Sequence, residues 1–349
     1  MTSFHVPYLS GNEIKYIQQL IDTGTHFSGD GVFTMKCKKF LEELTKSRVL
    51  LTPSCTHALE MAAILIDVQP GDEIIMSPYT FPSTANAFEL RGAKVVYCDI
   101  REDNLNIDER LIQRHLTTKT KAIVAMHYAG VGCDMETICA IAKEHHLFVI
   151  EDAAQCIDAY QNKKHLGTFG DIGCISFHET KNIHCGEGGA ILINNEQLLE
   201  RAEIIREKGT NRSKFLRGEI SFYQKVDIGS SYLLSELNAA FLWAQLQDLK
   251  KVTQDRLRNW NLYFNFFHSA GIENISFSQG KVGHNAHIFW VISRKENLKS
   301  KDAFLGHYQL LEQSKNWTVA HATKNLMRLS LETQNVEIVI KELKMKFGE

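Results

Sequence analysis

The chain has 349 residues, of which 44% are hydrophobic and 23% are charged. Lysine and arginine number 39 against 41 acidic residues, so the formal net charge is −2. This near balance argues against a nucleic-acid binder or a protein that docks on anionic membranes, since both need a basic excess to meet phosphates. The composition indicates a soluble globular protein, and the length predicts one large and one smaller domain, because single cores rarely exceed about 250–300 residues.

The absence of targeting patterns and the spacing of the cysteines indicate the compartment of the protein. No stretch approaches the roughly 20 apolar residues of a membrane span, and the first residues lack the basic-then-apolar pattern of a secretory signal. The eight cysteines are scattered, without a CxxC pair or the spacing of a zinc site. We therefore expect a cytoplasmic protein with reduced thiols, no metal site and no membrane partner.

Short apolar runs rich in valine and isoleucine alternate with segments of helical period through the first two thirds of the chain. The helical segments include His57–Ile66 and Met135–His146. Apolar strands separated by helices are typical of a mostly parallel sheet covered on both faces, so we expect a doubly wound α/β domain. The predicted strands are Arg48–Thr52, Glu73–Met76, Lys94–Asp99, Ala122–Met126, Leu147–Asp152, Cys174–His178 and Ala190–Asn194.

The pattern changes after the last predicted strand. A long helical pattern runs from Leu233 to Phe267, as expected for an element that joins a large domain to a small one. The following residues are less periodic, and only Val336–Phe347 again looks helical. We expect a large domain at residues 1–245 and a small C-terminal domain at 246–349.

Ligands of parallel sheets bind at the carboxyl ends of the strands. After the first strand, Ser54, Cys55 and Thr56 lead directly into a helix, where free N–H groups, the helix dipole and hydroxyls would hold a phosphate. Taken alone, residues of this kind are more often an ordinary helix cap. Neither GxGxxG nor GxxxxGK[ST] occurs there, which argues against a dinucleotide or P-loop site.

Three further loops at this edge contain side chains that could bind a ligand or take part in catalysis. Tyr79 and Phe81 follow the second strand, and either ring would lie on a planar ligand, although single aromatics are more often core packing. Asp152 ends an apolar strand, and a carboxylate buried there requires a cationic or protonated partner. That partner is either a ligand or, as the alternative, a side chain in a structural ion pair. Lys181 follows the strand at Cys174–His178, where a lone lysine would normally be solvated.

One ligand uses all four loops, namely pyridoxal 5′-phosphate. Its phosphate would lie at the helix N-terminus, its ring against Phe81, and its ring nitrogen against Asp152, while its aldehyde would form a Schiff base with Lys181. The carboxylate would keep the ring nitrogen protonated, which makes the cofactor an electron sink. Lys181 would act as covalent anchor and then as general acid and base.

Longer stretches resemble the sugar-nucleotide aminotransferases of the DegT/DnrJ/EryC1/StrS family. The resemblance runs from about Val6 to Leu249 and implies the fold type I architecture of pyridoxal-phosphate transferases, with a large sheet domain and a small C-terminal domain. It also implies a homodimer whose active site lies between two subunits. The stretches that carry the resemblance are SCTHALE (54–60), YTFPSTANAF (79–88), EDAAQ (151–155), SFHETKN (176–182), GEGGA (186–190), SGDGVFT (28–34), HYAGVGC (127–133), REKGTNRSKFLRG (206–218) and DIGSSYLLSEL (227–237).

The resemblance also implies roles for individual residues. Lys181 is the expected Schiff-base lysine and Asp152 the partner of the ring nitrogen, while Gln155 is expected near the ring hydroxyl. Phe81, rather than Tyr79, is expected to stack on the ring. His178 would lie near the reacting carbon, with a structural histidine as the alternative. The expected phosphate ligands are Ser54, Cys55, Thr56 and Ser176.

Two departures from the family pattern are visible. Where many members have GYNYR in a segment that closes the neighbouring subunit's site, this chain has GSSYL at 229–233, so Ser230 or Ser231 is expected to replace the family's asparagine. The C-terminal domain looks shorter than usual, and His307-Tyr308 is a possible remnant of a missing HYxPLH-like stretch.

The resemblance finally implies an activity. An amino group would pass from L-glutamate to C4 of dTDP-4-keto-6-deoxy-D-glucose, giving dTDP-4-amino-4,6-dideoxy-D-galactose for surface polysaccharide such as the enterobacterial common antigen. One alternative is an aminotransferase that acts on a different keto sugar nucleotide (gluco epimer or C3), and another is a non-catalytic homologue. A dehydratase is disfavoured because dehydratases of the family carry histidine in place of the lysine. A nicotinamide-dependent enzyme is disfavoured because this chain lacks the glycine motif of such enzymes. The candidate cations for the nucleotide diphosphate are Lys208, Arg212, Lys214 and Arg217, and a solvated run of surface charges is the alternative for each of them.

Overall fold

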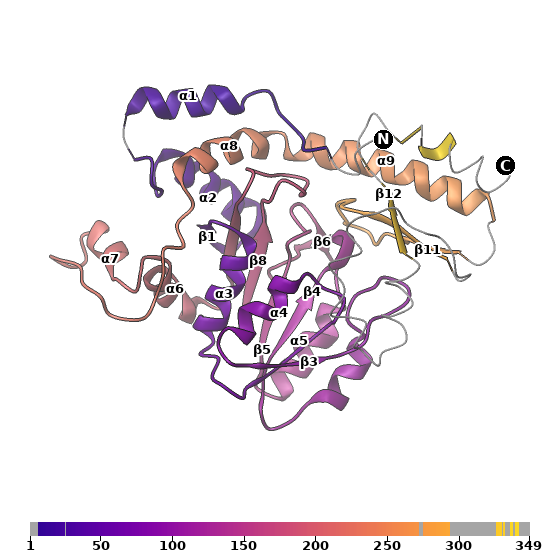
Figure 1. Ribbon diagram of the computed structural model, residues 1–349, viewed down its shortest axis with the longest axis horizontal. Helices are drawn as coiled ribbons and strands as arrows, with labels where there is room; N and C mark the ends of the chain where they lie inside the picture. Colours follow the sequence, from indigo (N-terminus) through magenta and orange to yellow (C-terminus); the bar gives the residue numbers. More distant parts are fainter. Residues whose placement is uncertain are drawn as a thin grey trace.

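The computed structural model describes residues 6–24, 26–271, 275–293, 326–329, 331, 336–337 and 339–341. Within these residues the centre of the molecule is a seven-stranded sheet in the order β1-β9-β8-β5-β4-β2-β3, with helices on both faces (Figure 1). The predicted α/β class is therefore confirmed. The strands of this sheet are β1 (Arg48–Thr52), β2 (Glu73–Met76), β3 (Lys94–Tyr97), β4 (Thr120–Met126), β5 (Phe148–Asp152), β8 (Ile172–Ser176) and β9 (Gly189–Ile193).

The sheet is parallel from β3 to β8, but β9 runs antiparallel to both of its neighbours, β8 and β1. The expectation of alternating strands and helices fails here for a topological reason. Residues 177–188, which join β8 to β9, contain no helix, so the chain returns beside β8 in the opposite direction. Because of this return, the loop after β8 is held at both of its ends by the sheet.

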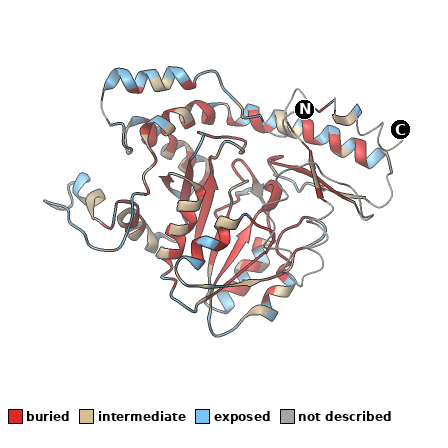
Figure 2. Cartoon of the chain, viewed as in Figure 1, coloured by how far each residue is buried: buried red, intermediate tan, exposed pale blue. Residues whose placement is uncertain are grey.

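The helices cover the sheet as separate layers. One layer, formed with α3, α4 and α6, contacts side chains such as Leu50 and Ile191, while α2 and α8 contact the alternate residues, such as Leu51 and Leu192, on the other face. The strands of this sheet are coloured as buried along most of their length in Figure 2. The helices are α1 (Glu13–Thr23), α2 (Val32–Thr45), α3 (Cys55–Leu65), α4 (Pro82–Glu89), α5 (Met135–Glu144), α6 (Leu199–Arg206), α7 (Arg212–Leu216), α8 (Glu236–Gln247) and α9 (Leu249–Ser269), with 3-10 turns at Glu109–His115, Tyr128–Gly130 and Glu196–Leu198.

The long helix expected from Leu233 to Phe267 is two helices. Ser235 lies in extended backbone and its hydroxyl accepts from the N–H of Asn238, so α8 begins only after it. At Asp248 the backbone leaves helical geometry, and its carboxylate accepts a 2.6 Å hydrogen bond from the Tyr8 hydroxyl. The prediction of continuous helix was wrong at these two points because polar side chains take up backbone or distant partners there.

A second layer of strands packs on α9. In the described residues β10 (Ile275–Phe277), β11 (Phe289–Ser293) and β12 (Leu326–Leu329) form an antiparallel sheet, whose apolar face meets Trp260, Tyr263 and Phe267 of α9. The short strands β6 (Tyr160–Gln161) and β7 (Lys164–His165) form a hairpin. The division after residue 245 stays a prediction.

Some sequence predictions fall outside the described residues. His307 and Tyr308 do so entirely. Of Val336–Phe347, residues 336–337 and 339–341 are described, and they are helical as expected. In the described part of the chain, every helix is too short or too polar to cross a bilayer.

Candidate active site

The loop after β8 brings Lys181 to the carboxyl edge of the parallel strands. The backbone N–H of Lys181 donates to the carbonyl of His178 over 2.9 Å, which turns the loop back on itself. Burial lowers the pKa of Lys181, while the neighbouring Cys55 and Asp152 act in the opposite direction. The loops of α3, β5 and β8 therefore lie close together, and the stretch after β2 joins them because Thr84 contacts Asp152.

Asp152 is buried at the end of β5 and lies in a chain of hydrogen bonds. Its Oδ2 accepts from the Thr84 hydroxyl over 2.6 Å, and that hydroxyl in turn accepts from Thr80 over 2.8 Å. Its Oδ1 accepts from the N–H of Ala154 over 3.2 Å. No cationic side chain among the described residues forms an ion pair with it, so the alternative of a structural ion pair fails there. The arrangement presents an oriented, buried carboxylate to a cationic ligand atom.

Thr80 and Thr84 were not singled out in the sequence. They lie within the stretch at 79–88, but only the turn into α4 aims both hydroxyls at the end of β5. No helical spacing could have found this pair, because Thr80 lies before the first residue of α4.

The first turn of α3 carries the predicted phosphate site. The Ser54 hydroxyl accepts from the N–H of His57 over 3.1 Å and lies 2.9 Å from its Nδ1, so Ser54 caps the helix as the simpler interpretation held. The N–H groups of Cys55 and Thr56 precede the first intrahelical bond, and they remain available to an anion. Gly189 of β9 packs against Ser54, where any Cβ would overlap the backbone.

Ser176 and His178 lie on the same loop as the lysine. Ser176 is buried at the end of β8, and its Oγ accepts from the N–H of His178 over 3.3 Å. The Nδ1 of His178 accepts from the N–H of Thr180 over 3.2 Å, and its Nε2 lies 3.6 Å from the Glu187 carboxylate. His178 is thus tied into its own loop, and its role at the reacting carbon stays a prediction.

The two candidate aromatic residues have different environments. Tyr79 is 1% exposed and packs edge-on against Tyr128, with ring centroids 4.9 Å apart and the hydroxyls 3.2 Å apart. Phe81 is 51% exposed at the start of α4. Because only the Phe81 ring is accessible, the structure favours it as the stacking residue.

Gln155 is held by the loop after β4. Its Oε1 accepts from the N–H of Ala129 over 2.6 Å, and its carbonyl accepts from the side chain of Asn285 over 2.8 Å. Ala129 has a φ of 58°, in the left-handed region, and it is followed by Gly130. The Gln155 side chain is therefore fixed by long-range contacts that the sequence did not predict.

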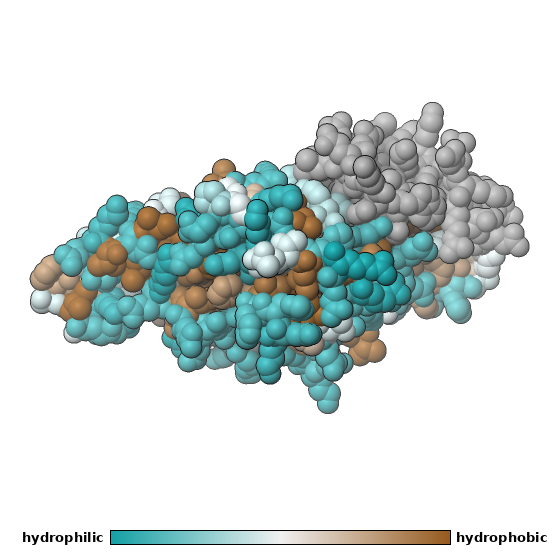
Figure 3. Space-filling view, turned by 90° about the horizontal axis from the view of Figure 1, so that it is seen from below, coloured by the Kyte–Doolittle hydropathy of each residue, from teal (hydrophilic) through white to brown (hydrophobic). Residues whose placement is uncertain are grey.

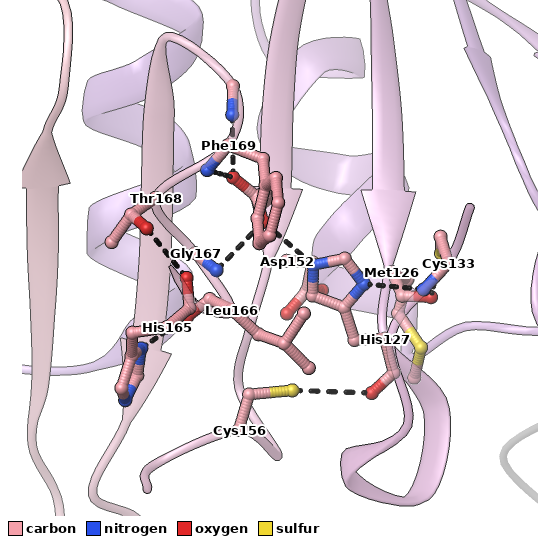
Figure 4. Close-up of polar contacts among 12 residues, drawn as sticks. Met126, His127, Cys133, Asp152, Cys156, His165, Leu166, Gly167, Thr168 and Phe169 are labelled. Atoms are coloured by element: carbon pink, nitrogen blue, oxygen red, sulfur yellow. Dashed lines mark hydrogen bonds and ion pairs between the residues drawn. The ribbon is translucent and has the colours of Figure 1, made fainter. Parts of the chain in front are cut away.

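Directly behind Asp152, Glu151 points to the opposite face of the sheet. It is fully buried, and its carboxylate accepts from the N–H groups of Gly167, Phe169 and Gly170 over 2.6–2.7 Å (Figure 4). The fourth donor is Nε2 of His127, at 2.9 Å, because Nδ1 of that ring accepts from a backbone N–H, that of Cys133. Sequence reasoning missed this network, which anchors the turn that leads into β8.

Ser230 and Ser231 are exposed and lie in an extended segment beside the end of α6. The N–H of Ser230 donates to the carbonyl of Ile205, and the backbone of Ser231 pairs with that of Glu207 in an isolated antiparallel β-bridge. The next residue, Tyr232, packs edge-on against His57 in the first turn of α3, with ring centroids 5.4 Å apart. The contact of either serine with the cofactor phosphate of a neighbouring subunit stays a prediction.

The candidate basic residues of the 206–218 stretch are all paired within the chain. Arg212 and Lys208 contact Glu207 at 2.8 and 3.5 Å, and Lys214 contacts Glu200 at 2.6 Å. Arg217 contacts both Glu203 and Glu219. Nothing in this geometry directs them toward a diphosphate. By contrast, Arg328 on β12, which the sequence did not suggest, lies close enough to Lys181 to act on its pKa.

The residues at this edge of the sheet fit pyridoxal 5′-phosphate. A buried carboxylate without an ion-pair partner would meet the protonated ring nitrogen, a partly buried lysine beside it would meet the aldehyde, and open N–H groups at a helix start would meet the phosphate.

Comparisons with known proteins agree with this interpretation. The chain is 33% identical over 256 residues to the spore coat polysaccharide biosynthesis protein SpsC of Bacillus subtilis, covering 72% of this chain and 66% of SpsC. It is 30% identical over 252 residues to GDP-perosamine synthase of Vibrio cholerae, covering 72% and 67%. Its fold matches that of the aminotransferase TlmJ from Streptoalloteichus hindustanus with a TM-score of 0.89 at 22% identity, covering 100% of this chain and 99% of TlmJ.

The profile of the DegT/DnrJ/EryC1/StrS aminotransferase family matches residues 7–321. The architecture is that of the fold type I transferases that use pyridoxal 5′-phosphate. The chain thus belongs to the DegT/DnrJ/EryC1/StrS aminotransferase family, and it is a transaminase that depends on pyridoxal 5′-phosphate.

Proposed function

We propose that this transaminase moves the amino group of L-glutamate to C4 of dTDP-4-keto-6-deoxy-D-glucose, giving dTDP-4-amino-4,6-dideoxy-D-galactose. The product would serve surface polysaccharide synthesis, such as that of the enterobacterial common antigen. The observation that carries the proposal is the meeting of Lys181, Asp152 and the start of α3 at one edge of the sheet, within sequence stretches that resemble this group of enzymes.

When bound, pyridoxal phosphate supplies an electron sink that stabilises a carbanion next to the transferred nitrogen. Asp152, oriented by Thr84, would hold the ring nitrogen of the cofactor and favour its protonated form. Lys181 would hold the cofactor through its aldehyde, and the Lys181 amine would move a proton at the substrate carbon. Burial that lowers the pKa of Lys181 favours the neutral amine, which is the form that can accept this proton.

The enzyme is proposed to act as a cytoplasmic homodimer, in which Ser230 or Ser231 reaches the partner's cofactor phosphate. Exposed apolar side chains on the segment 215–228 support a subunit contact, because patches of this kind mark protein interfaces. This segment lies at the left end of the molecule in Figures 1 and 3. Its exposed apolar residues are Phe215, Leu216, Phe222, Tyr223, Val226 and Ile228.

The nucleotide is the part of the proposal with a specific competitor. The relative from Vibrio cholerae is named for a GDP-linked sugar, so guanosine is the alternative to thymidine. A panel of dTDP-, UDP- and GDP-linked keto sugars, each offered with L-glutamate and followed by mass spectrometry, separates them. NMR of the product then assigns C4 or C3 and the galacto or gluco epimer. Amination of only GDP-linked sugars would overturn the dTDP assignment.

The role of Lys181 has its own test. Lys181→Ala is expected to lose both turnover and the visible absorbance of the bound cofactor, because no other amine would hold the aldehyde. Lys143→Ala, an exposed change on α5, is the matched control and should keep both. Unchanged turnover in Lys181→Ala would overturn the assignment.

The choice of L-glutamate as the amino donor has its own test. Mixing the holoenzyme with saturating L-glutamate should convert the bound cofactor to its amine form, which a change in the visible absorbance reports. No conversion would overturn L-glutamate as the donor.

A further inference from the structure

A short segment next to the small sheet crosses directly behind the lysine loop. Residues 284–288, which we call the strap, precede β11, and Asn285, Ala286, His287 and Ile288 within it are all buried. Three different parts of the active site meet at the strap. They are the loop after β8, the loop after β5, and the turn after β4.

The contact with the loop after β8 is made at the residue next to Lys181. The Nδ1 of His287 lies 2.8 Å from Oδ1 of Asn182, and Nδ2 of Asn182 donates to the carbonyl of Asn285 over 3.1 Å. Asn182 is 3% exposed. Its amide therefore uses both its acceptor and its donor on the strap, which fixes the peptide that carries Lys181.

The contact with the loop after β5 is made by Asn285, which is fully buried. Its Nδ2 donates to the carbonyls of Gln155 and Ile157, both over 2.8 Å. Its Oδ1 lies against Gly130 of the turn after β4, where a Cβ would overlap it, and the neighbouring Ala129 holds the Gln155 side chain. One asparagine thus fixes the loop of Gln155 from behind.

The strap is also bound to the helix that carries the small sheet. Arg256 of α9 donates through Nε to the carbonyl of Ala286 over 3.1 Å and through Nη2 to that of His287 over 2.8 Å. Since β11 follows within the same stretch of chain, the strap connects the small sheet rigidly to the loops of Lys181 and Gln155.

We propose that Asn182, Asn285 and His287 are positioning residues, which hold Lys181 and Gln155 at a fixed place relative to the small sheet through the strap. The inference rests on the proposed roles of those two residues. Its physical basis is that proton transfer by Lys181 requires placement to within about 1 Å, and displacement of this size typically costs about 100-fold in rate.

The test uses Asn182→Ala and Asn285→Ala, with Gly130→Ala as a variant that displaces Asn285 without removing a hydrogen-bonding group. The matched controls are Asn259→Ala, which removes a buried amide that donates to the carbonyl of Leu331, and Gly71→Ala, which strains a left-handed glycine with nothing described near its Cβ. Urea denaturation places all variants on one stability scale.

The first readout is hydrogen–deuterium exchange of the holoenzyme, in peptides that cover 177–188 and 155–161. Both peptides should exchange about 10-fold faster or more in Asn182→Ala and in Asn285→Ala, although each variant alters only one side of the strap. The controls should leave both peptides unchanged at comparable loss of stability. Exchange that matches the controls, or that rises only at the mutated loop, would overturn the inference.

The second readout is the first-order rate at which saturating L-glutamate bleaches the visible band of the holoenzyme. This rate should fall about 10- to 100-fold in the strap variants and stay within about twofold in the controls. A wild-type enzyme that does not react with glutamate would contradict the proposed function, whereas the exchange experiment would still decide the strap. A wild-type enzyme that reacts, with strap variants equal to the controls, would refute the strap alone.

Discussion

Replacing Glu151 by glutamine tests how the buried carboxylate behind the cofactor site supports the fold. Oε1 accepts from Phe169 and Gly170, and Oε2 accepts from Gly167 and from Nε2 of His127. The glutamine amide keeps only one of these two accepting oxygens, because an NH₂ group replaces the other. In either orientation its NH₂ faces two N–H donors, which lose their partner and cannot reach water because Glu151 is fully buried.

Each buried donor left without an acceptor costs about 1–3 kcal/mol, so Glu151→Gln should lower the free energy of unfolding by about 2–6 kcal/mol. This is a large part of the roughly 5–15 kcal/mol that stabilises a typical domain. The compensating gain, the loss of a buried charge, is small here because four hydrogen bonds already solvate that charge.

Urea denaturation at neutral pH, with an unchanged m value, measures the effect. Glu43→Gln is the control, since its side chain is 67% exposed and only 4.0 Å from Lys39, and it should change stability by less than about 0.5 kcal/mol. A Glu151→Gln protein within about 0.5 kcal/mol of wild type would refute the account of this network.

Two further predictions follow from the same region. Gly189→Ala should lower the free energy of unfolding by about 1–3 kcal/mol and weaken cofactor binding, because the added Cβ would displace Ser54 at the start of α3. Urea denaturation measures the first effect, and a titration of the apoenzyme with pyridoxal phosphate measures the second. Unchanged affinity would contradict the placement of the phosphate. Burial lowers the pKa of His165 to about 4, so the unfolded chain, with a pKa near 6.5, binds the proton first as pH falls, and stability should decline by up to about 3 kcal/mol between pH 6.5 and 4. His165→Gln should lose this part of the slope, and parallel stability curves for the two proteins would contradict it.

The strand pattern was largely readable from the sequence, because continuous apolar runs have few alternatives to a buried strand. β1 and β2 have the predicted bounds, and the other predicted strands differ by one or two residues at their ends. The antiparallel course of β9 was not readable, since direction depends on what connects two strands and not on the composition of either. The small sheet was missed because its strands are short and lack a clear period.

At the candidate site, the sequence by itself predicted which residues carry the chemistry, because Asp152 ends a predicted strand and Thr56, Phe81 and Lys181 lie in loops that follow predicted strands. Only the tertiary structure decided how those residues are held. Thr84 reaches Asp152 across 68 positions of sequence, and His287 reaches Asn182 across 105. Such contacts leave no local pattern, because a side chain's partner is set by where the folded backbone brings it and not by its neighbours in the chain.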